Sequence, residues 1–63
     1  MTTPTPEDLR MLAGESGRAI DRLLEIAARW RAGGDEAGAA AVEETISRLA
    51  RLKRGARDAL NAR

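Results

Sequence analysis

The densest charged segment of this chain is a basic stretch at its C-terminal end, SRLARLKRGARDALNAR. Residues 48–63 carry six basic side chains against one acidic side chain. Four arginines recur there at intervals of three residues: Arg48, Arg51, Arg54 and Arg57. Spread along the outward face of a helix, guanidinium groups can follow a row of phosphates. The alternative is a solvated face that complements acidic neighbours and the helix dipole. No aromatic side chain is interleaved to stack on bases, which favours the solvated face.

Side chains that commonly carry catalysis are scarce. The sequence contains no His and no Cys, so it lacks the base of a nucleophilic triad, imidazole and thiolate metal ligands, and disulfides. The carboxylate pairs Asp21/Glu25 and Glu43/Glu44 have the chemistry to bind a hard cation. An arginine four residues after Glu25 and after Glu44 indicates solvated ion pairs instead. We expect no catalytic residue, no metal site, no cofactor and no enzymatic activity.

The sequence predicts two helices that position these side chains. Thr5 is a good N-cap, and Pro6 suits the first helical position, where its missing N–H is not needed. This helix is predicted to run over residues 6–32. The motif GGD at 33–35 supplies a C-terminal cap, a turn and the next N-cap, and the second helix is predicted over 36–62. We expect residues 1–5 to be a flexible tail and residues 6–62 to form one domain.

Both predicted helices carry apolar seams with alternating spacings of three and four residues. The first seam is Leu9, Ala13, Ser16, Ile20, Leu23, Ala27 and Trp30. The second is Ala39, Val42, Ile46, Leu49, Lys53, Ala56 and Leu60. A short turn between long helices makes them antiparallel neighbours. The predicted fold class is therefore all-α, an antiparallel αα-hairpin.

The apolar faces are wider than one hairpin can cover. Further flanking positions are Leu12, Ala19, Leu24, Ile26, Thr45, Leu52 and Ala59. Chains of 63 residues rarely form stable monomers without staples or a partner. We therefore expect a homodimeric, antiparallel four-helix bundle. The predicted oligomer interface comprises Leu12, Ile20, Leu23, Leu24, Ile26, Val42, Ile46, Leu49 and Leu52.

The stretch AGESG at 13–17 places two glycines inside the first predicted helix. Each glycine costs about 1 kcal/mol relative to Ala in a helix interior. If the helix is continuous, Ala13 and Gly17 allow close packing of a neighbouring helix. The alternative is a break after Ala13, with Ser16 capping a new helix. We favour the continuous helix.

Trp30 is the sole aromatic residue and lies beside the predicted turn. It continues the seam and so closes one end of the bundle; alternatively, it anchors a partner. A helical hairpin with Trp near its turn resembles the secreted WXG-type hairpin proteins, although the sequence WRAGG places Gly33 three residues after Trp30 rather than two. In length and topology the chain also resembles the Rop-like dimeric RNA-binding hairpin. No residue roles are carried over from either family.

These features predict a non-enzymatic protein–protein interaction module, such as an adaptor, regulator, inhibitor or assembly component. The alternative is a Rop-like dimeric nucleic-acid-binding protein that uses the arginine face. The net charge of +1 selects no partner. We expect no secretory signal, since no charged segment is followed by an apolar one, and no apolar run approaches the ~20 residues of a membrane span. We expect a cytoplasmic homodimer with a protein partner and no membrane association. Ten arginines against one lysine are typical of a GC-rich bacterial or phage genome.

Overall fold

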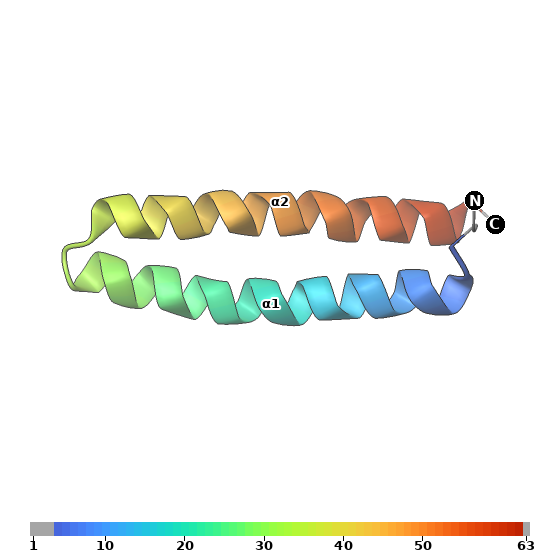
Figure 1. The fold of residues 1–63 in the computed structure, drawn as a ribbon, viewed down its shortest axis with the longest axis horizontal. Helices are drawn as coiled ribbons and strands as arrows, with labels where there is room; N and C mark the ends of the chain where they lie inside the picture. The colour runs from blue at the N-terminus through green and yellow to red at the C-terminus, as the bar shows by residue number, and fades with distance from the viewer. Residues whose placement is uncertain (1–3, 63) are drawn as a thin grey trace.

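A computed structural model describes residues 4–62, which form two helices joined by a short turn. Helix α1 spans Pro6–Ala32 and helix α2 spans Glu36–Asn61. They lie side by side and run in opposite directions, so that the start of α1 and the end of α2 lie together at the end of the hairpin remote from the turn (Figure 1). The hairpin measures 45 × 19 × 16 Å. The predicted all-α antiparallel hairpin is confirmed.

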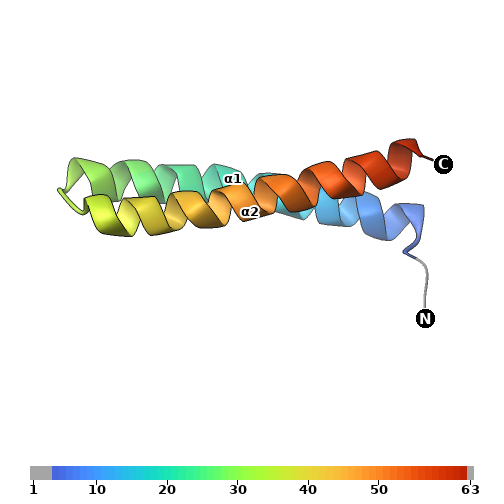
Figure 2. The same ribbon diagram turned by 90° about the horizontal axis from the view of Figure 1, so that it is seen from above.

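The two helices cross at a shallow angle rather than lying strictly parallel, as Figure 2 shows. Long helices that wrap gently around each other keep one seam in contact along their length. The predicted tail at residues 1–5 falls partly on residues 1–3, which lie outside the described residues, as does residue 63.

Local side-chain chemistry sets the helix boundaries. Thr5 Oγ1 accepts a hydrogen bond of 3.1 Å from the backbone N–H of Asp8, and Asp35 Oδ1 accepts one of 2.8 Å from the N–H of Gly38. In the turn, Gly34 has φ = +92°, a backbone region that favours glycine. The boundaries predicted from the caps hold, except that α2 ends at Asn61, one residue before the predicted end.

Helix α1 is continuous through the AGESG stretch. Ser16 lies inside the helix and is only 3% exposed, so it packs against α2 rather than capping a new helix. The predicted continuous helix is confirmed, and the alternative break after Ala13 is wrong.

The buried seam between the helices consists mostly of small side chains. The residues exposed by less than a tenth are Leu9, Ser16, Ala27, Ala39 and Ala56. Among residues 4–62, no large side chain is fully buried. Each buried Ala removes much less apolar surface from water than a buried Leu or Ile. The hairpin by itself therefore has a thin core, and most of its large apolar side chains are only half-buried or exposed.

Candidate interaction site

Two edges flank the seam, one on each side of the plane that contains the two helix axes. Residues seven apart lie on the same side of a helix, because seven residues make about two turns. One edge, here called the polar edge, carries Arg10, Gly17, Leu24 and Arg31 of α1 and Glu43, Ala50 and Arg57 of α2. The other, here called the apolar edge, carries Leu12, Ala19 and Ile26 of α1 and Thr45, Leu52 and Ala59 of α2.

Contacts between the helices show which rows lie together. Near the turn, Arg31 Nη2 lies 2.6 Å from Glu43 Oε1. Near the chain ends, Gly17 and Arg57 line the same groove. These contacts join the α1 row and the α2 row of the polar edge at both ends of the hairpin. The remaining two rows therefore share the opposite edge.

The apolar edge exposes large side chains along the length of the hairpin. Leu12 is 38% exposed and Leu52 is 45% exposed, and Trp30, a seam residue on the same side as this edge, is 44% exposed. Ile26 between them is half-buried. Large apolar side chains that recur along one edge of a small protein and are open to water indicate an interaction surface.

Large and small side chains alternate along this edge. Along α1 the order is large, small, large: Leu12, Ala19, Ile26. Along α2 the order is small, large, small: Thr45, Leu52, Ala59. Because Lys53 lies across from Gly17 and the helices are antiparallel, Leu52 is level with Ala19. At each level of the edge, a large side chain on one helix therefore lies beside a small side chain on the other. Knobs-into-holes packing requires this alternation of protrusions and depressions.

Among the predicted interface residues, Leu12, Ile26 and Leu52 lie on the apolar edge, and the half-buried seam residues Leu23, Val42 and Leu49 lie on the same side of the seam. Ile20 and Ile46 are also half-buried seam residues, but they lie on the side of the polar edge, seven residues from Ala13 and from Lys53 respectively. Leu24 instead lies seven residues from both Gly17 and Arg31, on the polar edge, where it is 51% exposed. A single flat interface on the apolar edge does not include Leu24. That seven-residue spacing was visible in the sequence.

At the turn end, the polar edge is closed by a bridge from one arginine to two carboxylates. Arg31 Nε lies 3.0 Å from Glu36 Oε2, and its other nitrogens hydrogen-bond both Glu43 oxygens. The hydrogen bonds to Glu43 and Glu36 raise the pKa of Arg31, and the bond from Arg31 lowers the pKa of the Glu43 carboxyl. All three side chains are exposed, so solvent screens the bridge and it mainly fixes the geometry of the turn end.

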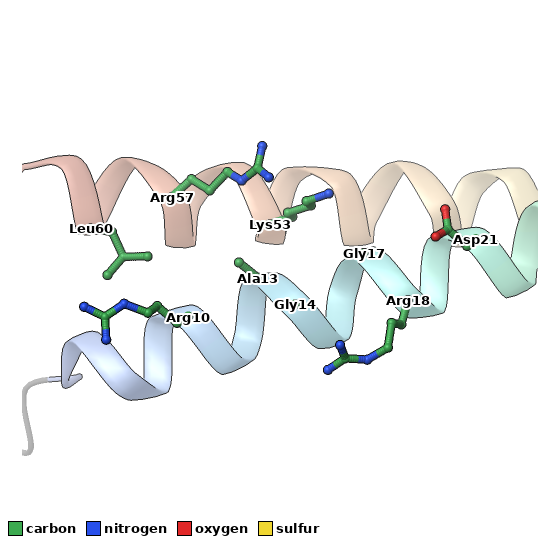
Figure 3. A pocket seen from close by; sticks show the side chains of 9 residues that line it. All are labelled: Arg10, Ala13, Gly14, Gly17, Arg18, Asp21, Lys53, Arg57 and Leu60. Atoms are coloured by element: carbon green, nitrogen blue, oxygen red, sulfur yellow. The ribbon is translucent and has the colours of Figure 1, made fainter.

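At the other end, the polar edge opens into a groove of about 490 Å³, here called the basic groove (Figure 3). It is lined by Arg10, Ala13, Gly14, Gly17, Arg18, Asp21, Lys53, Arg57 and Leu60. A Cβ atom added at Gly17 would lie 3.2 Å from Lys53 Nζ and 3.7 Å from Lys53 Cε, with no α2 backbone within 4 Å. The predicted close-packing residues Ala13 and Gly17 thus face the basic groove, and the atoms nearest to Gly17 belong to the Lys53 side chain.

The four arginines of the predicted phosphate-tracking row do not all face one way. Residues three apart are displaced by about 60° around a helix, so the row spirals from the outward face to the polar edge. Arg48 pairs with Glu44 at 2.9 Å, whereas Arg57 lines the basic groove. The spacing of Glu25 and Arg29 produces no ion pair in the described part of the chain. A continuous nucleic-acid face on α2 therefore gains little support.

Comparisons with known proteins assign no function to these surfaces. The chain matches no protein-family model, no curated protein and no solved structure. The resemblances to WXG-type and Rop-like hairpins therefore rest on length, topology and the position of Trp30. Over residues 4–62, neither helix contains an apolar stretch that would cross a bilayer, and no group of three or more acidic side chains is arranged to hold a metal ion.

Proposed function

We propose that this chain is a non-enzymatic, cytoplasmic protein–protein interaction module that works as a homodimer. The observation that carries the proposal is the set of large side chains exposed on or beside the apolar edge, where Leu12, Trp30 and Leu52 are each open to water by more than a third. The seam between the helices contributes chiefly alanines, which is too little burial for a chain of this size to be stable alone. Covering the apolar edge supplies the missing core.

The occupant we propose for the apolar edge is a second copy of the same chain. A two-fold axis parallel to the hairpin places α2 of one copy over α1 of the other at the same level. Leu52 of each copy then meets Ala19 of the other, and Leu12 meets Ala59. This seats each large side chain against a small one and forms a four-helix bundle with both turns at the same end.

Such a dimer leaves the outward faces and the polar edges of both copies open. These exposed surfaces are available to a further protein. The module would then act as an adaptor, regulator, inhibitor or assembly component, and the dimer is its binding-competent form.

Sedimentation equilibrium tests the proposal directly. We expect a dimer of the 6.8 kDa chain at micromolar concentration, and a melting temperature that rises with protein concentration. A compact, folded monomer with a concentration-independent melting temperature would contradict the proposal.

A spin-label measurement tests the arrangement of the two copies. The chain has no Cys, so a single Ala37→Cys variant can be labelled at the exposed start of α2. With both turns at the same end, the two labels lie close together. With the turns at opposite ends, the labels are separated by most of the 45 Å length of the hairpin.

A further inference from the structure

The basic groove contains two residues that each break the pattern of their own helix. Lys53 occupies a seam position at which the heptad pattern calls for an apolar side chain. Gly17 occupies a helix interior, at a cost of about 1 kcal/mol relative to Ala. The two residues face each other, since a Cβ on Gly17 would come within 3.2 Å of Lys53 Nζ. Local violations that coincide in space are expected at functional sites.

Lys53 as a whole residue is half-buried, and its ammonium group has no hydrogen-bond or ion-pair partner among residues 4–62. Figure 3 shows its side chain running along α2 in the direction of Gly17 and Asp21. Arg10 and Arg57, which also line the groove, are likewise unpaired in that part of the chain. Arg18 is the one groove cation with an acidic partner, Glu15, at 2.5 Å.

The cationic side chains that line the groove outnumber the carboxylates that line it. Its lining contains four cationic side chains and the single carboxylate of Asp21, a net charge of +3 by side-chain count, whereas the whole chain carries only +1. The bridge at the turn end shows how this protein compensates an arginine elsewhere, with two carboxylates on Arg31. Lys53, Arg10 and Arg57 have no such partners within residues 4–62, which leaves these three cations available to an external anion.

We propose that the basic groove binds a phosphate group carrying two negative charges, as free phosphate or as the phosphate of a small monoester. Such a group carries about −1.5 to −2 charges near pH 7 and three strong acceptor oxygens. The ammonium of Lys53 offers three donors, and the flanking guanidiniums of Arg10 and Arg57 offer forked ones. A carboxylate, with a single charge, would leave most of the positive charge unmatched. Gly17 is small because a side chain there would occupy the space beside the ammonium.

The same observations disfavour a nucleic-acid chain in this groove. Its lining contains no aromatic side chain on which a base could stack, and the sole aromatic residue, Trp30, lies at the other end of the hairpin. Each internal phosphate of a nucleic acid carries one charge rather than two. The site lies on the polar edge, opposite the proposed dimer interface, so phosphate binding and dimerisation are independent inferences.

An NMR titration at constant ionic strength tests the site. Inorganic phosphate and glycerol phosphate are added in parallel to the full chain, with sodium chloride exchanged to hold the salt concentration. We expect saturable binding with amide shifts concentrated at Gly14, Gly17 and Lys53. Tighter binding of glycerol phosphate identifies an esterified ligand and tighter binding of inorganic phosphate a free one; either result supports the site.

Three variants separate a built site from diffuse attraction to a basic surface. We expect Lys53→Met to weaken phosphate binding about tenfold or more, because charge-assisted hydrogen bonds are lost. Gly17→Leu should do the same with the net charge unchanged. Arg51→Met removes one charge from the exposed face of α2 outside the groove and should change the affinity less than twofold. Circular dichroism confirms folding, and Lys53→Met should be at least as stable as the parent because its seam becomes apolar.

Specific results would overturn the proposal. They are shifts that grow linearly without saturation, equal shifts with chloride, or an Arg51→Met variant weakened as much as Lys53→Met. A short RNA that binds more tightly than glycerol phosphate and depends equally on Arg51 and Lys53 would also overturn it. Sedimentation of the same samples keeps the outcomes distinguishable: a monomer that still binds phosphate at the groove refutes the proposed dimer and supports the site.

Discussion

The two edges of the hairpin are built on the same pair of helices, yet they carry opposite chemistry. The apolar edge presents Leu12, Ile26 and Leu52 with small residues between them, and no charged side chain belongs to its rows. The polar edge carries the Arg31–Glu43 bridge near the turn and the basic groove near the chain ends. On each helix the two edges are two residues apart in sequence, such as Gly17 and Ala19, which places them about 160° apart around the helix. This rotation separates a surface that needs a partner from one that water can cover.

This difference explains how so thin a core can belong to a folded protein. If both edges were apolar, the hairpin would have two surfaces that each bind another copy, and it would polymerise rather than close into a dimer. If both were polar, nothing would supplement the buried alanines. One apolar edge and one charged edge define a single, self-limiting interface.

The contrast between the two edges is tested most strongly by introducing an aspartate separately at two adjacent residues, Leu23 and Leu24. Leu23→Asp puts a carboxylate beside the seam on the apolar side, where we expect dissociation and unfolding together, with a loss of about 3 kcal/mol or more for a buried, unpaired charge. Ile46→Asp, in the seam of α2, should behave similarly. Sedimentation and chemical denaturation measure both effects.

The matched control for that experiment is Leu24→Asp. Leu24 is 51% exposed on the polar edge, so its replacement should leave the dimer intact and change stability by about 1 kcal/mol or less. Dissociation of both variants would show that the interface extends over both edges.

Trp30 tests the turn end of the apolar edge. We expect Trp30→Ala to weaken dimerisation roughly 30-fold, about 2 kcal/mol, as for a buried aromatic anchor. Met11→Ala removes a side chain that is 67% exposed, on the outward face of α1, and should leave the affinity unchanged. Because Trp30 is the only aromatic residue, its fluorescence in the parent should shift to shorter wavelength as the protein concentration rises. Emission that is independent of concentration would argue against its burial in the dimer.

Two glycine-to-alanine substitutions test whether the Lys53 side chain packs against Gly17 in the basic groove. A Cβ at Gly55 meets nothing within 4 Å, so Gly55→Ala should stabilise the helix by about 1 kcal/mol. Gly17→Ala gains the same helix propensity, but the Lys53 ammonium must move a few tenths of an ångström, so a smaller gain is expected. Thermal melts of the two variants give the difference. A Gly17→Ala gain that equals or exceeds the Gly55→Ala gain would show that Lys53 does not rest on Gly17.

The smallest expected effect concerns the bridge at the turn end. The hydrogen bond from Arg31 lowers the pKa of the Glu43 carboxyl below its ordinary value of 4.5, so the bridge stabilises the folded state above that pH. This contribution is lost as the pH falls through the lowered pKa. We expect Glu43→Gln to flatten the acid side of the stability profile below pH 4.5, slightly and less than any substitution above. Glu25→Gln, which removes a carboxylate without an ion pair, should leave the profile unchanged.

Much of the fold could be read from short stretches of sequence. Thr5 and Asp35 act as N-caps where their side chains predicted, and the GGD motif forms the turn, because caps and turns depend on residues within one helical turn of each other. The seams follow equally directly from apolar spacings of three and four. The glycines of AGESG did not break α1, because Ser16 and Ala13 keep the apolar phase on both sides of them.

The tertiary structure alone decided how the two helices align along their length, and with it the composition of the two edges. Helix phase places Gly17 and Leu24 in one row of α1, but it does not say which residues of α2 lie opposite. The alignment sets Lys53 on Gly17 and brings Glu43 to Arg31, twelve residues away. Those contacts depend on the geometry of the turn and the packing of the whole seam, which no local pattern encodes. The sequence therefore determined the helices, their apolar faces and the position of Leu24 in the row of Gly17, whereas the packing of one helix on the other produced the basic groove and the Arg31–Glu43 bridge.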